Sequence, residues 1–207
     1  MRDWSPSQRP LSFDEYMAWE EKSTRKHEFV NGEVYAMSGV TRRHDLIAGN
    51  VYAHLRAAAR GTPCRAYTSD MKVRVAASVT YYPDVSIDCA SHSDADVIID
   101  HPCLVVEVTS RSTFRTDRGE KLENYRRAPS LRMYLIVDQN RRRVTCHRRN
   151  DDDTWTAEEH EGGGSIAVPC PRMELTLDDI YEGVQMPPLG VAEPEIDEAT
   201  GEYVVER

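Results

Sequence analysis

A carboxylate inside an otherwise apolar segment is the feature that most constrains how this chain folds. Residues 103–108 read CLVVEV, a nearly continuous apolar run that is typical of a strand buried on both faces of a sheet. Burying the carboxylate of Glu107 in such a strand is costly unless the group is paired or binds a metal ion. The segment therefore predicts both a central strand and an acid with a partner.

The rest of the chain alternates between helical and strand patterns around this segment. Helices are predicted at about 12–21, 43–60 and 115–127, and strands at about 64–68, 72–75, 81–87, 103–108, 133–137, 144–147 and 155–160. Ser12 and Glu15 predict a capping box, and Asn31-Gly32 between two apolar runs predicts a β-hairpin. The 207 residues suit one α/β domain over 11–186, with a flexible arm at 1–10 and a disordered acidic tail at 187–207.

Composition limits the classes of protein to which the chain belongs. The net charge of −9 argues against a protein that coats nucleic acid by bulk charge, although it leaves room for a local basic face. No apolar run approaches the roughly 20 residues of a membrane helix, and the N-terminus has no apolar signal core. We therefore expect no membrane association and a cytoplasmic protein.

The five cysteines are odd in number and scattered along the sequence (Cys64, Cys89, Cys103, Cys146 and Cys170). Because no two of them are spaced as C-x-x-C, the sequence does not predict a zinc knuckle or a redox pair. A reduced protein is the interpretation that fits this pattern best.

A second acid, Asp84, follows Pro83 at the start of a predicted strand. If that strand neighbours the strand of Glu107, the two carboxylates lie a few ångströms apart and repel each other without a cation. Mg²⁺ or Mn²⁺ suits such a site, because these ions bind few protein carboxylates and keep several waters. An ion there activates water and polarises a phosphate oxygen.

The helix after Glu107 supplies a positive group. Asp117, Lys121 and Asn124 fall at spacings of four and three and so share one helix face. Lys121 is expected to point back toward Glu107, where an ammonium group orients the attacking water and stabilises developing phosphorane charge.

Several motifs in order resemble a known family. They are LSFDEYMAWEE, HEFVNGEVYAMSG, the helix around His44, YYPDV, LVVEVTS, RGEKLENYRR and SLRMYLIVDQNRRRVTCHRR. Together they resemble the Uma-two family of endonucleases within the PD-(D/E)xK nuclease superfamily. The resemblance extends from Leu11 to about Val184.

The resemblance implies a restriction-endonuclease-like fold, which is a mixed central β-sheet flanked by helices, with an N-terminal helix and β-hairpin. It implies that Asp84 and Glu107 are metal ligands. The superfamily lysine usually follows the glutamate by two residues, and Thr109 stands there in this chain. Lys121 fits a lysine that has migrated to the next helix.

Other residues have weaker claims on the site. Glu33 is a possible third acid, His44 a possible phosphate contact at a helix N-terminus, and Asp117 a neighbour of Lys121. Structural roles remain open for each residue: Asp84 in a turn, Glu107 paired with an arginine, Lys121 paired with Asp117, Glu33 exposed in the hairpin, and His44 capping or packing.

The first functional hypothesis is a Mg²⁺-dependent endonuclease, a hydrolase of phosphodiester bonds in nucleic acid, with DNA favoured over RNA. Its proposed phosphate contacts are Arg115, Arg118 and Arg126. The alternative is a degenerate nuclease-fold module that binds protein or nucleic acid without cleaving it, and a third option is a structural dimer without a site. A homodimer is compatible with each hypothesis.

Overall fold

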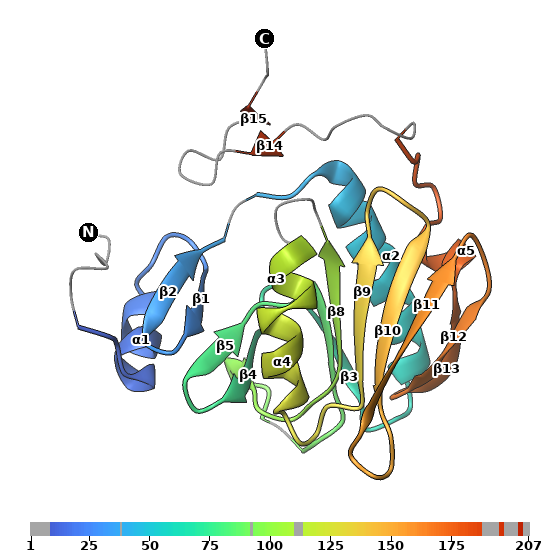
Figure 1. Ribbon diagram of the computed structural model, residues 1–207. Helices are drawn as coiled ribbons and strands as arrows, with labels where there is room; N and C mark the ends of the chain where they lie inside the picture. Colours follow the sequence, from blue (N-terminus) through green and yellow to red (C-terminus); the bar gives the residue numbers. More distant parts are fainter. Residues whose placement is uncertain are drawn as a thin grey trace.

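A mixed six-stranded sheet forms the centre of the protein in a computed structural model, which describes residues 9–37, 39–91, 93–109, 114–187, 195–196 and 203–204 (Figure 1). Its strand order is β11 (Trp155–Glu161), β10 (Arg143–Arg149), β9 (Met133–Asp138), β8 (Pro102–Thr109), β6 (Val85–Asp88) and β3 (Arg65–Thr68). β8 and β9 are parallel, and the other neighbours are antiparallel. The predicted mixed central sheet is confirmed.

Helices cover both faces of this sheet (Figure 1). α2 (Arg42–Ala59) packs on one face, and α3 (Phe114–Arg118) and α4 (Glu120–Arg126) lie on the other. Successive side chains of a strand point to opposite faces, so Leu104, Val106 and Val108 of β8 join the core under α2. Val105 belongs to the core under α4. The same alternation turns Glu107 toward α4.

A second, smaller sheet lies beside α4. Its strand order is β2 (Glu33–Ala36), β1 (His27–Val30), β5 (Val79–Tyr81), β4 (Lys72–Ala76) and β7 (Ile98–Ile99). Buried residues of this sheet share one core with Leu122 and Tyr125 of α4. This packing brings the N-terminal hairpin, formed by β1 and β2, to the α4 face of the central sheet.

Local signals in the N-terminal part are confirmed. α1 (Phe13–Glu20) starts with the predicted capping box of Ser12 and Glu15. Asn31 and Gly32 have φ angles of 51° and 94°, as the predicted hairpin turn requires. Glycine is needed there for a second reason, because a Cβ on Gly32 would lie 2.4 Å from the Cβ of Pro10.

Two predicted elements are interrupted in the structure. The strand expected at 81–87 is two strands, β5 and β6, because Pro83 has no N–H to donate to a ladder and the chain leaves one sheet for the other there. The helix expected at 115–127 is broken at Gly119, whose φ and ψ of −113° and −96° are not helical. The sequence analysis also missed β12 (Ser165–Pro169), β13 (Arg172–Thr176) and α5 (Leu177–Ile180).

The ends of the chain are described only in part. Residues 1–8 of the predicted arm lie outside the described residues. In the predicted tail, β14 (Glu195–Ile196) pairs with β15 (Tyr203–Val204), and 188–194, 197–202 and 205–207 lie outside the described residues. No helix within the described ranges has the length and apolar character needed to cross a membrane.

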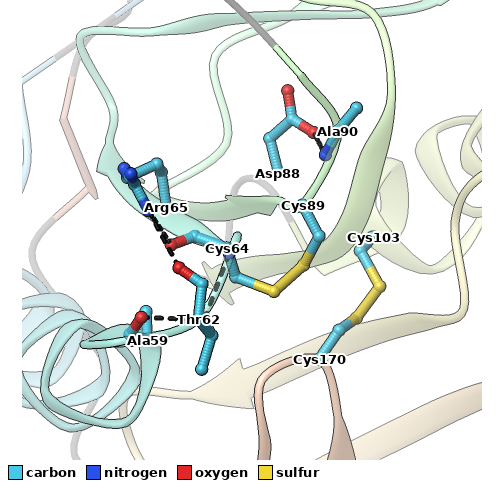
Figure 2. Close-up of a disulfide and its surroundings, with 9 residues drawn as sticks. All are labelled: Ala59, Thr62, Cys64, Arg65, Asp88, Cys89, Ala90, Cys103 and Cys170. Carbon is cyan, nitrogen blue, oxygen red and sulfur yellow. Dashed lines mark hydrogen bonds between the residues drawn. A yellow bond between two sulfur atoms is a disulfide. The ribbon is translucent and has the colours of Figure 1, made fainter.

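The cysteines do not match the sequence interpretation. Disulfides join Cys64 to Cys89 and Cys103 to Cys170, whereas Cys146 is free and buried (Figure 2). Burial raises the pKa of the Cys146 thiol to about 11. The expectation of separate, reduced cysteines is therefore wrong for four of the five, because strand pairing brings together cysteines that are far apart in the sequence.

His147 on β10 makes stability depend on pH. Burial, followed by the charges of Arg126 and Arg118, lowers its pKa to about 4. The folded protein therefore keeps a neutral imidazole while the unfolded chain takes up a proton below its ordinary pKa of about 6.5. Stability attributable to His147 is then fully present above a pH of about 6.5 and is lost as the pH falls from about 6.5 through about 4, by about 2–3 kcal/mol.

We expect His147→Asn to remove this part of the pH dependence. Urea unfolding of the wild type and the variant at several pH values measures the effect. The exposed His101 offers a matched control, because His101→Asn should keep the wild-type slope. A slope that is identical in His147→Asn and the wild type would show that His147 is not held neutral.

Candidate active site

Asp84 lies at the crossing between the two sheets, immediately before β6. Its Oδ2 accepts a hydrogen bond of 2.7 Å from the backbone N–H of Val108 on β8. The antiparallel register pairs Val85 with Val106. Asp84 precedes Val85 and Glu107 follows Val106, so the two acids lie next to this pair on neighbouring segments. The structure thus brings the two predicted acids to the same place.

Glu107 is held from the α4 side. Its Oε1 accepts hydrogen bonds from Lys121 Nζ at 3.1 Å and from Tyr125 Oη at 2.9 Å. The glutamate is 5% exposed. No arginine pairs with it among the described residues, so the structural alternative of a Glu–Arg pair is not what the fold provides.

Lys121 sits among three carboxylates. Its Nζ lies 2.9 Å from Glu28 Oε1, 3.1 Å from Glu107 Oε1 and 3.7 Å from Asp117 Oδ1. These acids come from β1, β8 and α3. Asp117 and Lys121 still meet across the break at Gly119, as their predicted shared face requires, and Asn124 is buried as they are. The pairing of Lys121 with Asp117 is the longest of its three ion pairs.

The electrostatics of the cluster follow from its burial. Burial raises the pKa of Glu107 well above its ordinary value, against the opposing charge of Lys121. Burial alone lowers the pKa of Lys121, but the charges of Glu107 and Glu28 outweigh it and raise that pKa. Lys121 is therefore an ammonium ion, whereas the raised pKa of Glu107 favours its protonated form unless more positive charge than one lysine supplies lies beside it.

His44 contacts Asp84 from the start of α2. Its Nε2 lies 3.3 Å from Asp84 Oδ2, and Thr41 caps the helix by accepting a hydrogen bond from the N–H of His44. Burial lowers the pKa of His44, but the hydrogen bond and charge of Asp84 outweigh it, so the pKa is raised. Its Nδ1 is buried and has no hydrogen-bond partner among the described residues.

The donor set fits a hard divalent cation. Four carboxylates (Asp84, Glu107, Glu28 and Asp117) outnumber the two basic groups, Lys121 and His44. Asp84 Oδ1 and Glu107 Oε2 take no hydrogen bond or ion pair within the described part of the chain. In that part, these acids do not form a group of three donor atoms within 4.8 Å of one another. Such a site suits Mg²⁺ or Mn²⁺ held by Asp84 and Glu107, with waters completing the coordination.

A cleft of about 590 Å³ opens on the Asp84 side of the cluster. His44 and Asp84 are among its lining residues, and Arg25 and Lys26 contribute positive charge. Lys26 Nζ also binds the carbonyl oxygen of Ser69 and pairs with Asp70, and Arg25 is exposed. Of the four carboxylates of the cluster, Asp84 is the one that lines this cleft.

Other residues singled out from the sequence lie elsewhere. Glu33 is exposed on β2 and accepts a hydrogen bond from Tyr35, so it does not belong to the cluster. Arg118 contacts Thr145 and Glu159, and Arg126 contacts Glu123 and the Trp155 ring. Neither arginine lines the cleft. The Arg115 side chain lies outside the described part of the structure.

Sequence reasoning missed Glu28, Tyr125 and the basic pair at 25–26. Glu28 lies three residues before the Asn31-Gly32 turn, as Glu33 lies just after it. The hairpin pairs Glu28 with Tyr35, and only the packing of the hairpin against α4 decides which glutamate is turned inward. No local pattern carries that information.

Comparison with known proteins supports the same fold. A solved structure of a "putative nuclease belonging to DUF820" from Anabaena variabilis matches with a TM-score of 0.70 and 14% identity, over 85% of this chain and all of the other. At that identity the likeness shows the fold alone.

Sequence relatives are closer. An uncharacterized protein of Synechocystis is 32% identical over 84% of this chain and 93% of its own length. A second uncharacterized Synechocystis protein is 31% identical over 73% of this chain and 88% of its own. The family model described as "Uma2: Putative restriction endonuclease" matches residues 13–178. The chain therefore belongs to the Uma2 family of restriction-endonuclease-like proteins.

Proposed function

We propose that this protein is a Mg²⁺- or Mn²⁺-dependent endonuclease that hydrolyses phosphodiester bonds in DNA. The observation that carries the proposal is the meeting of Asp84 and Glu107 beside the buried ammonium of Lys121. Each of the two acids keeps one carboxylate oxygen without a partner among the residues that the structure describes. A divalent ion bound there activates a water molecule and neutralises charge on the phosphate.

The chain's own residues have distinct parts in this proposal. Lys121 and Tyr125 both hold Oε1 of Glu107, which fixes the carboxylate and leaves Oε2 for the ion. His44 and the Val108 N–H hold Oδ2 of Asp84 in the same way. Lys121 also supplies a positive charge close to the reacting phosphate, as preorganised cations do in phosphoryl transfer. The cleft beside His44 admits the strand to be cut.

One observation favours a non-cleaving alternative. Lys121 already compensates part of the charge of Glu28, Glu107 and Asp117, and Thr109 stands where the superfamily lysine usually lies. A degenerate module would retain this cluster without binding an ion. Calorimetry with Mg²⁺ and Mn²⁺ separates the two functions. An enzyme should bind the ion and lose that binding in Glu107→Gln, whereas the non-cleaving module should not bind it.

Asp84→Asn should reduce metal-dependent cleavage by about 100-fold or more, because it removes a charged ligand of the ion. The assay incubates pure protein with supercoiled plasmid, single-stranded DNA and RNA, with Mg²⁺, Mn²⁺ or a chelator. Asp178→Asn is the matched control, because Asp178 is an exposed carboxylate on α5 paired with Arg142. Cleavage that persists at the wild-type rate in Asp84→Asn would exclude this site as its source.

Lys121→Met should destabilise the protein by about 3–5 kcal/mol, because it leaves buried carboxylates without their cation. The free energy of unfolding in urea measures the loss. Lys22→Met, which changes an exposed lysine, should stay within about 0.5 kcal/mol of the wild type. Adding Glu28→Gln to Lys121→Met should restore part of the stability, and an equal stability of the two lysine variants would contradict the buried-ammonium interpretation.

Arg25→Gln should weaken DNA binding and lower the slope of log K against log salt by about 1, as loss of one phosphate contact does. Fluorescence anisotropy with a labelled duplex, in the Asp84→Asn background to prevent cleavage, measures both quantities. Arg172→Gln is the control, because Arg172 is exposed and does not line the cleft. Equal slopes for the two variants would remove the cleft as the DNA path.

A further inference from the structure

Four cysteines from four separate segments meet at one end of the central sheet (Figure 2). Cys64 precedes β3, Cys89 follows β6, Cys103 lies in β8, and Cys170 lies between β12 and β13. Asp84 and Glu107 sit toward the other ends of β6 and β8. The four-cysteine cluster (Cys64, Cys89, Cys103 and Cys170) is therefore separate from the acidic site, although two of the same strands carry both.

Three of the four sulfur atoms form one compact group, and the fourth is bonded to it. The Sγ atoms of Cys89, Cys103 and Cys170 all lie within 4.8 Å of one another, and Cys64 is bonded to Cys89. A zinc ion with four thiolates at about 2.3 Å in a tetrahedron separates its sulfur atoms by roughly 3.8 Å. Three sulfur atoms thus lie close to the spacing that a tetrahedral ligand set requires, and the Cys64 side chain must rotate toward them to complete the set.

The surroundings also suit a closed structural metal site. Cys64 and Cys170 are buried, whereas Cys89 and Cys103 are partly buried. Four sulfur donors and no open position are typical of structural zinc rather than catalytic zinc. Hard ions such as Mg²⁺ prefer oxygen ligands, so the two sites select different metals.

We propose that the reduced protein binds one zinc ion through the four-cysteine cluster. The state with two disulfides is the oxidised, metal-free form of the same site. A dithiol reductant gives two electrons and two protons to each disulfide and becomes a disulfide itself. The four resulting thiols release four protons as their thiolates bind Zn²⁺, and the zinc ion keeps its oxidation state throughout.

The zinc ion would tie the central sheet to the hairpin of β12 and β13. Three of the ligands, Cys64, Cys89 and Cys103, lie in or next to the paired strands β3, β6 and β8. The fourth, Cys170, comes from the hairpin of β12 and β13. The ion thus replaces two covalent links by a four-point link between the same segments.

The experiment uses the full chain, reduced with dithiothreitol and freed of reductant and metal without air. Titration with Co²⁺ should give the intense visible and charge-transfer bands of a tetrathiolate complex, and Zn²⁺ should displace them at about one ion per chain. Zinc should also protect about four thiols from a thiol reagent. Asp84→Asn should bind the same number of zinc ions per chain as the wild type. Absence of thiolate bands in the reduced wild type would overturn the proposal.

Variants assign the ligands. Cys103→Ser should lose the tetrathiolate bands or shift them to a three-sulfur spectrum, whereas Cys146→Ser, which changes the cysteine outside the cluster, should keep them. If Cys103→Ser fails to fold, the wild-type spectrum and thiol count still decide the question. Retention of unaltered bands in a folded Cys103→Ser protein would show that the metal binds elsewhere.

Discussion

The burial of one ammonium group among three carboxylates is the interaction on which the candidate site depends. Lys121 joins Glu28 of the small sheet, Glu107 of the central sheet and Asp117 of α3. Removing one partner of a buried ion pair leaves an uncompensated charge. The lysine therefore fixes the relative position of the two sheets as well as the orientation of Glu107.

A single strand serves both the core and the chemistry because of its alternation. In β8, Leu104, Val106 and Val108 fill the core under α2, and the intervening Glu107 reaches α4. Pro83 contributes in a different way, since it ends the ladder between the sheets and leaves Asp84 free to accept the N–H of Val108. The two acids thus meet through backbone geometry, and not through a flexible loop.

Local rules were sufficient for part of this architecture and not for the rest. The apolar run around Glu107, the spacing of Asp117 and Lys121 and the turn at Asn31-Gly32 are all encoded over a few residues, and the structure contains each. The choice of Glu28 over Glu33 depends on how the hairpin packs against α4, which no short segment specifies. The many arginines around 115–127 likewise do not indicate which way their side chains point. In the structure, Arg118 contacts β10 and Arg126 contacts β11. The cysteines were misjudged for the same reason, because their proximity arises from strand order.

In the reduced protein, the separation of carboxylates and cysteine thiols along β6 and β8 would have a chemical consequence. Oxygen donors at one end and sulfur donors at the other present different affinities, since Mg²⁺ takes hard oxygen ligands and zinc takes thiolates readily. A zinc ion caught at the acidic end would displace the hydrated ion that water activation requires. A stronger thiolate site on the same strands would draw zinc away from the acids, because a soft metal partitions toward sulfur. Zinc would then stabilise the cysteine end of the strand pair that positions Asp84 and Glu107, while it is kept away from these two carboxylates.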